Sequence, residues 1–106
     1  MTILKLKSKK QSLEVKRDIL INSQAYGIDL NNEINQINID ISNIEKSICN
    51  QWINSLNTKQ QYNMYLNCKF NPGELQLFAD MLTVNKDTLK HCLFIAYREI
   101  SDQYNS

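Results

Sequence analysis

The chain has 106 residues and a mass of 12.4 kDa, which is the size of one ordinary domain. Its residues are 42 % hydrophobic and 22 % charged, and the net charge of +1 does not by itself indicate a strongly charged partner. No run of 18 apolar residues occurs and the first residues lack the apolar stretch of a signal peptide, which excludes a membrane span and predicts a cytoplasmic protein.

The N-terminal segment, residues 1–11, is basic. It carries lysines at positions 5, 7, 9 and 10 and no acidic residue. Residues 3–6 fit a short strand, and a basic arm without regular structure fits equally well. We therefore expect a short basic arm or strand at this end of the chain.

A first helix is expected to follow this arm. Ser8 and Ser12 are alternative N-caps for it, and the helix is predicted to reach about Ala25. Gly27 marks the stop, because a residue in the left-handed region is needed there. Asp29 is then placed to cap the next helix.

The segment after residue 30 has the clearest periodic pattern. Its apolar residues recur in alternating steps of four and three, and then continue to Trp52: Leu30, Ile34, Ile37, Ile41, Ile44, Ile48 and Trp52. Such steps average 3.5 residues, which is the repeat of a coiled-coil seam. A strand is the alternative, since Ile37, Ile39 and Ile41 alternate, but the stripe is far longer than ordinary strands of about 5–6 residues. We predict one long helix over residues 30–56.

Acidic residues flank this isoleucine seam, whereas the first helix is basic. The acidic residues are Glu33, Asp40 and Glu45, and the basic ones are Lys9, Lys10, Lys16 and Arg17. A helical hairpin across residues 25–27 would pair the opposite charges, and a basic helix of another chain would fit the same seam. The seam is therefore predicted to be a protein interface, covered either by the first helix or by a foreign chain.

Two capping patterns predict helices after residue 57. Residues 58–61, Thr-Lys-Gln-Gln, fit a capping box that opens a short helix. Residues 71–74, Asn-Pro-Gly-Glu, place an Asn cap before Pro at the first helical position and predict a helix over residues 72–82. Phe70 and Leu75 are spaced as a hydrophobic staple across this start.

The last helix is predicted to begin after Asn85, which is its cap. Val84 and Leu89 are spaced as a second staple, and the apolar face continues to Ile100, so that the helix ends near Asp102. With only two glycines and one proline, the chain has few helix breakers. We therefore predict an all-α fold of four to five helices with one long coiled-coil-like helix, organised as an arm (1–11), a helical hairpin (12–57) and a helical C-terminal part (58–106).

Few residues are suited to catalysis or metal binding. The chain has one histidine, His91, and three cysteines without zinc-ligand spacing, Cys49, Cys68 and Cys92, which we expect to be reduced thiols. Two glycines cannot build a dinucleotide or phosphate loop of standard form. We expect no enzyme activity, cofactor, metal or small-molecule substrate, and we expect Trp52, Tyr62 and Tyr65 to be core residues rather than stacking platforms for bases.

Residues 75–94 resemble a helix-turn-helix. Ala79 takes the small position where two helices cross, and the buried positions of the motif are filled by Phe78, Leu82, Val84, Leu89 and Cys92. The resemblance implies DNA binding, with these side chains in the major groove: Lys86, Asp87, Thr88, Lys90 and His91. Thr83 departs from the motif, which has Gly in the turn, and a left-handed backbone there would be strained. An ordinary helical hairpin matches the same apolar pattern.

Two functions follow from these patterns. The first is a non-enzymatic protein-interaction module (an adaptor, assembly factor or phage- or plasmid-type inhibitor) that binds a protein partner or self-associates through helix faces. The second is a small DNA-binding regulator or mobile-element accessory protein, in which Lys9 and Lys10 would add phosphate contacts. The 13 isoleucines, 14 asparagines and 10 lysines have A/T-rich codons, which is typical of a low-GC genome, phage or plasmid.

Overall fold

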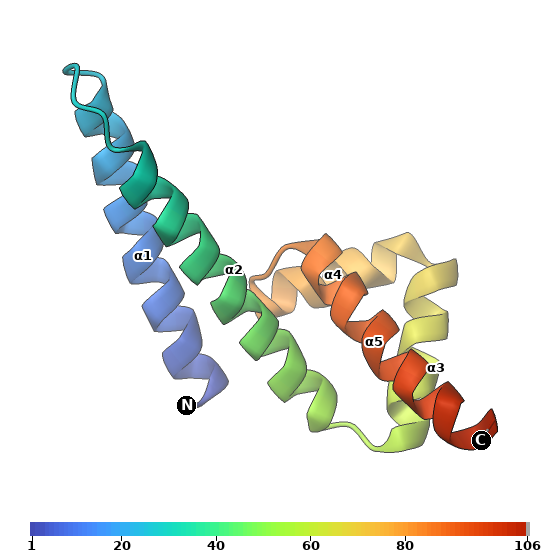
Figure 1. Cartoon of the computed structure of the whole chain (residues 1–106). Coiled ribbons are helices and arrows are strands. Elements are labelled where there is room, and N and C mark those ends of the chain that lie inside the picture. Colours follow the sequence, from blue (N-terminus) through green and yellow to red (C-terminus); the bar gives the residue numbers. More distant parts are fainter. Residues whose placement is uncertain (106) are drawn as a thin grey trace. The chain divides into compact units, whose positions relative to one another are not determined.

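The computed structural model describes residues 1–105, with side chains through residue 104, and shows five helices and no strand among them (Figure 1). The helices are α1 (Ile3–Gln24), α2 (Asn31–Asn54), α3 (Thr58–Phe70), α4 (Pro72–Leu82) and α5 (Lys86–Asn105). The all-α prediction is confirmed. None of these helices combines the length and the apolar content needed to cross a bilayer, as far as the chain is described.

The chain divides into two compact units. Unit 1 covers residues 1–45 and unit 2 begins at residue 46, so that the boundary lies inside α2 rather than in the connection after it. The long helix predicted over residues 30–56 is confirmed as α2, and the alternative of a strand at Ile37–Ile41 is wrong.

The predicted basic arm or strand at residues 1–11 is also wrong, because α1 begins at Ile3. Thr2 is its N-cap, and the Thr2 hydroxyl accepts a hydrogen bond of 3.2 Å from the backbone N–H of Lys5. The cap therefore lies before both predicted serines. Lysine is a good helix former, so the four basic residues extend the helix instead of interrupting it.

The turn between α1 and α2 follows the prediction. Gly27 has φ 89°, in the left-handed region, two residues after the helix cap at Ala25. Asp29 accepts a hydrogen bond of 3.1 Å from the backbone N–H of Asn31, the first residue of α2. Both residues therefore have the local roles that their side chains predicted.

Helices α1 and α2 of unit 1 run antiparallel and are joined by three polar pairs at regular intervals (Figure 1). The pairs are Lys10 Nζ to Glu45 Oε1 (3.4 Å), Arg17 Nη1 to Asn38 Oδ1 (3.1 Å), and the side-chain amides of Gln24 and Asn31 (2.8 Å). On each helix the paired residues are seven apart. Seven residues make about two helical turns, so the same faces of two packed helices meet again at this interval.

The inner face of α1 mixes apolar and polar side chains. Every residue on it is buried or half-buried: Ile3, Leu6, Lys10, Leu13, Arg17, Leu20 and Gln24. Leu13 and Ile44 line one shallow hollow between the two helices. Lys10 is only 8 % exposed, and its ammonium also lies 3.9 Å from Glu14. The isoleucine seam of unit 1 is thus covered by the chain's own first helix.

Unit 2 is built on α3, α4 and α5, each of which contacts the other two. Its buried apolar side chains come from all three helices, from the turn between α4 and α5 and from the end of α2: Ile48, Cys49, Ile53, Cys68, Leu75, Ala79, Leu82, Val84, Leu89, Cys92, Leu93 and Ile100. Aromatic rings border this core. The rings of Trp52 and Phe78 lie 5.2 Å apart, and Tyr65 stacks on Tyr97 at 4.3 Å.

The start of α3 shows a capping box one residue earlier than predicted. Asn57, not Thr58, is the N-cap: its side chain accepts a hydrogen bond of 2.8 Å from the Gln60 N–H, and Gln60 Oε1 accepts one of 3.0 Å from the Asn57 N–H. Asn and Gln satisfy two free N–H groups reciprocally, as Thr58 and Gln61 were expected to do.

Candidate nucleic-acid interface

Helix α4 begins and ends at the predicted residues, Pro72 and Leu82. The Asn71 side chain makes no capping hydrogen bond, and its carbonyl accepts one of 3.0 Å from the Glu74 N–H instead. The Phe70 ring is 72 % exposed, with the Lys69 ammonium 5.9 Å from its centre, so it is not a buried partner for Leu75. Proline at the first position and Leu75 in the core fix this start.

The turn from α4 to α5 closes at Thr83, which has φ 53° and ψ 48°. The Val84 N–H donates to the Ala79 carbonyl (3.0 Å) and the Thr83 N–H donates to the Asp80 carbonyl (3.1 Å), which is a Schellman motif. The backbone at Thr83 is therefore left-handed, which is the condition under which the sequence predicts strain. Asn85 then caps α5, since its side chain accepts a hydrogen bond of 2.8 Å from the Asp87 N–H.

The buried positions predicted from the helix-turn-helix resemblance are filled as expected. Ala79 and Leu89 have no exposed surface, Leu82, Val84 and Cys92 are also buried, and Phe78 is half-buried. Helix α3 packs against both helices of the pair. This arrangement leaves the opposite side of α5 in solvent.

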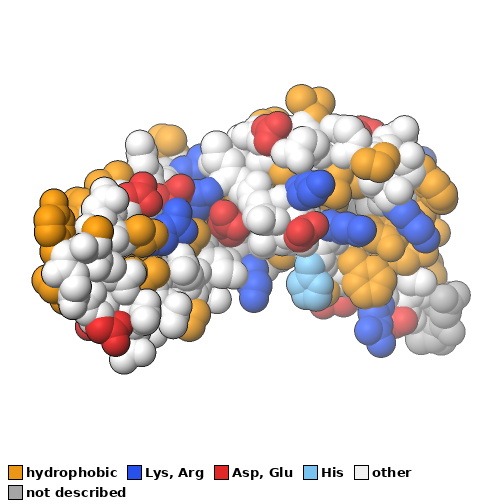
Figure 2. Space-filling view, turned by 90° about the horizontal axis from the view of Figure 1, so that it is seen from above, with side chains coloured by type: hydrophobic (Ala, Val, Ile, Leu, Met, Phe, Trp, Pro, Cys, Tyr) orange, Lys and Arg blue, Asp and Glu red, His pale blue; other side chains and the backbone are white. Residues whose placement is uncertain are grey.

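Five residues on that side form what we call the α5 face: Asp87, Lys90, His91, Phe94 and Arg98. They lie in steps of three and four along the helix, which places them on one side, and all are exposed. Figure 2 shows basic and acidic side chains around the single histidine, beside hydrophobic side chains. The sequence prediction missed Arg98, because the resemblance ends at residue 94.

Lys69, in the last turn of α3, adds a further cation beside the α5 face. Lys69 and Lys90 line one hollow together with Tyr65 and Cys68, and Lys90 also borders a second hollow with His91 and Phe94. Burial raises the pKa of Cys68, and the nearby Glu74 carboxylate raises it further. Lys69 and Lys90 therefore share one hollow with the Tyr65 ring and the Cys68 thiol.

The other four residues predicted to contact DNA differ in their exposure to solvent. Lys86 is exposed at the first position of α5, and Thr88 is half-buried. Lys9 is exposed in unit 1. Lys10 is buried against Glu45 inside the helical hairpin, so its charge is directed to a carboxylate of the same chain.

The residues predicted as a protein interface are mostly inside the fold. Ile37, Ile41, Ile44 and Ile48 are buried, and the three others, Leu30, Ile34 and Trp52, are half-buried. Of the two coverings that the sequence left open, the structure shows the first helix on the part of the seam in unit 1. The seam is therefore not an outward surface.

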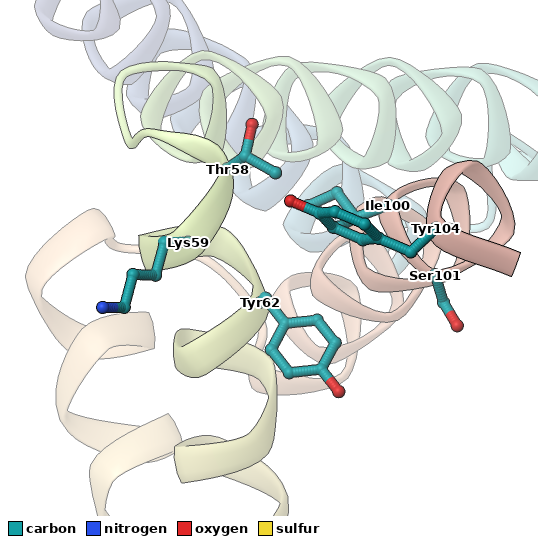
Figure 3. Close-up of a pocket in the computed structure, with 6 residues that line it drawn as sticks. All are labelled: Thr58, Lys59, Tyr62, Ile100, Ser101 and Tyr104. Atoms are coloured by element: carbon teal, nitrogen blue, oxygen red, sulfur yellow. The ribbon is translucent and has the colours of Figure 1, made fainter.

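A separate hollow lies in unit 2 where the start of α3 meets the end of α5 (Figure 3). Its volume is about 490 Å³, and it is lined by Thr58, Lys59, Tyr62, Ile100, Ser101 and Tyr104. The lining has four hydroxyl groups and one ammonium. Lys59 is thus an exposed lysine of unit 2 that borders this hollow and not the two hollows beside Lys90, which makes it a suitable control position.

Over residues 1–105, no three His, Cys, Asp or Glu side chains are grouped closely enough to hold a metal ion. Comparisons with protein-family models, with curated proteins and with solved structures find no match to this chain. The geometry of the two units is therefore the basis for assigning a function.

Proposed function

We propose that the chain binds duplex DNA through α5. The observation that carries the proposal is the left-handed turn at Thr83, which holds α4 and α5 as a packed pair on α3 while the α5 face stays in solvent. A helix supported in this way can enter a major groove about 12 Å wide.

The side chains of the α5 face suit this role. Lys90 and Arg98 lie two turns apart on one side of the helix, and Lys69 and Lys86 flank them, which gives four cations for phosphates. His91 can donate to or accept from base edges, and Phe94, which is 42 % exposed, can contact thymine methyl groups. Asp87 opposes phosphate and can accept from a cytosine amino group.

A salt titration tests the proposal. If the four cations each neutralise one phosphate, the logarithm of the affinity for random duplex DNA falls against the logarithm of salt with a slope of about −3 to −4. Between 50 and 200 mM salt the affinity then drops roughly 100-fold. Fluorescence anisotropy of a labelled duplex measures both quantities.

Two alanine variants make the test specific. Lys90→Ala should reduce the slope by about one, and Lys59→Ala should leave it unchanged because Lys59 borders the other hollow. The proposal is wrong if no binding occurs at 50 mM salt, or if both variants change the slope equally.

Self-association through the outer side of α1 is a second candidate function. Opposite the inner face, α1 carries an uncharged, exposed stripe: Leu4, Ser8, Gln11, Ser12, Val15, Ile19 and Asn22. Leu4, Val15 and Ile19 are 76 %, 55 % and 59 % exposed. We propose that a second copy of the chain covers this outer stripe of α1, which would replace the isoleucine seam as the protein-binding surface.

The lack of charge in the outer stripe favours a second copy. None of its seven residues is charged, so two identical helices can meet on this stripe without placing like charges opposite each other. Light scattering should give a dimer mass that Val15→Lys abolishes and Ile39→Lys, at an equally exposed position of α2, does not. A monomer mass for the unmodified chain at 100 µM, roughly the upper range of weak dimers, would contradict it.

A further inference from the structure

Two cysteines that are far apart in the sequence meet in the core of unit 2. Cys49 lies on α2 and has no exposed surface, and Cys92 lies on α5 and is 5 % exposed. Their side chains are joined by a hydrogen bond. The two sulfur atoms are therefore within hydrogen-bonding distance of each other, on two different helices.

Cys92 also lines a hollow at the surface of unit 2. The hollow has a volume of about 470 Å³, and the charged or titratable residues that line it with Cys92 are Lys46, His91 and Glu99. A water molecule takes about 30 Å³, so a small peroxide has ample room beside the thiol. Cys49, by contrast, has no exposed surface and is not among the residues that line this hollow.

The environment activates one thiol of the two. The hydrogen bond from Cys49 stabilises the Cys92 thiolate, the Lys46 ammonium adds to this effect, and together they outweigh burial and lower the pKa of Cys92 to about 7. Near neutral pH about half of the Cys92 side chains are thus nucleophilic thiolates. Cys68, whose pKa is raised, remains a thiol under the same conditions.

We propose that Cys49 and Cys92 form a redox-sensitive dithiol pair, which a hydroperoxide entering the hollow beside Cys92 closes to a disulfide between α2 and α5. The Cys92 thiolate attacks the peroxide oxygen, the O–O bond breaks, and the leaving hydroxide takes up a proton to become water. The Cys49 sulfur then attacks the sulfenic acid and displaces its oxygen, which leaves as a second water with the thiol proton. Two thiols lose two electrons, and one hydrogen peroxide gains them.

Mass spectrometry of the full chain tests the pair directly. Treatment with one to five equivalents of hydrogen peroxide at pH 7 should lower the intact mass by two hydrogens without forming covalent dimers. Trypsin separates the cysteines onto peptides 47–59, 60–69 and 91–98. Under non-reducing conditions we expect peptide 47–59 linked to peptide 91–98, and dithiothreitol should release both.

Serine variants distinguish the roles of the three thiols. In Cys49→Ser, Cys92 should stop at the sulfenic acid, which dimedone traps. In Cys92→Ser, oxidation of Cys49 should be at least ten-fold slower, because the accessible thiolate is gone. Cys68→Ser is the matched control and should form the 47–59 to 91–98 link at the rate of the unmodified chain.

Three results would overturn the proposal. They are a link that includes peptide 60–69, disulfides only between different chains, and oxidation of Cys68 before Cys92. Circular dichroism of each variant confirms that it is folded, and the unmodified chain gives a decisive peptide map even if one variant does not fold.

Discussion

Replacing Thr83 with glycine should stabilise the protein. Thr83 has φ 53° and ψ 48°, and it is the single residue other than glycine with positive φ in the described chain. For an L-residue this conformation costs about 1–2 kcal/mol, whereas glycine adopts it freely. Because the branched side chain of threonine restricts rotation further, Thr83→Gly removes this strain, and the exposed Thr83 side chain gives up little buried surface.

Two opposing effects reduce the gain. Glycine gives the unfolded chain more freedom, which costs about 0.5–1 kcal/mol. The Thr83 hydroxyl also donates a hydrogen bond of 2.6 Å to the Leu82 carbonyl, but Thr83 is exposed, so water replaces most of it. The net stabilisation should be about 0.5–1 kcal/mol, equivalent to a rise of about 2–8 °C in the melting temperature.

Thermal unfolding followed by circular dichroism measures the change. Thr83→Ala keeps the Cβ atom and should gain less than glycine. Gln76→Gly, on the exposed side of α4 where the backbone is right-handed, should instead lose about 0.5–1 kcal/mol. If Thr83→Gly melts at or below the temperature of the unmodified chain, or if alanine gains as much, the argument from backbone strain fails.

Three further predictions concern the two units. Ile41→Asp should cost about 3–5 kcal/mol and Ile39→Asp less than about 0.5, because the first side chain is 8 % and the second 55 % exposed, and urea unfolding compares them. Lys10→Leu should lose about 1–3 kcal/mol by leaving the Glu45 carboxylate unpaired, and adding Glu45→Leu should recover the loss in a double-mutant cycle; no recovery would contradict a charge effect. Folding lowers the pKa of Cys92, so the stability that its thiolate contributes is present at pH 9 and is lost as the pH falls through about 7. Cys92→Ser should remove this pH dependence, and melting temperatures measured over a series of pH values check it.

Local patterns predicted the helix boundaries best. The Asn-Pro-Gly-Glu start and the Leu82 end of α4 were both found, since a cap depends on residues within one or two turns. Gly27, Asp29 and Asn85 are further examples. The N-terminal arm was misread, because a threonine cap at the second residue is weak evidence beside a run of lysines.

Pairings between distant residues could not be predicted. The inner face of α1 went unseen because Lys10, Arg17 and Gln24 interrupt its apolar residues, and only their partners on α2 explain them. The Cys49–Cys92 contact joins two helices that no local pattern connects. Of the candidate site, the sequence predicted Lys90 and His91, because their exposure follows from the helix period. It did not predict Arg98, which lies beyond the end of the helix-turn-helix resemblance.

The seven-residue spacing of the polar pairs has a consequence for how α1 finds its place on α2. The leucines of α1 repeat at positions 6, 13 and 20, and the isoleucines of α2 recur at a similar interval, so sliding one helix by seven residues would leave the apolar contacts nearly unchanged. A slide in one direction would set Ile3 against Glu45 and leave a half-buried carboxylate without its cation. The ion pair of Lys10 and Glu45 therefore disfavours this alignment, which the hydrophobic residues alone would accept.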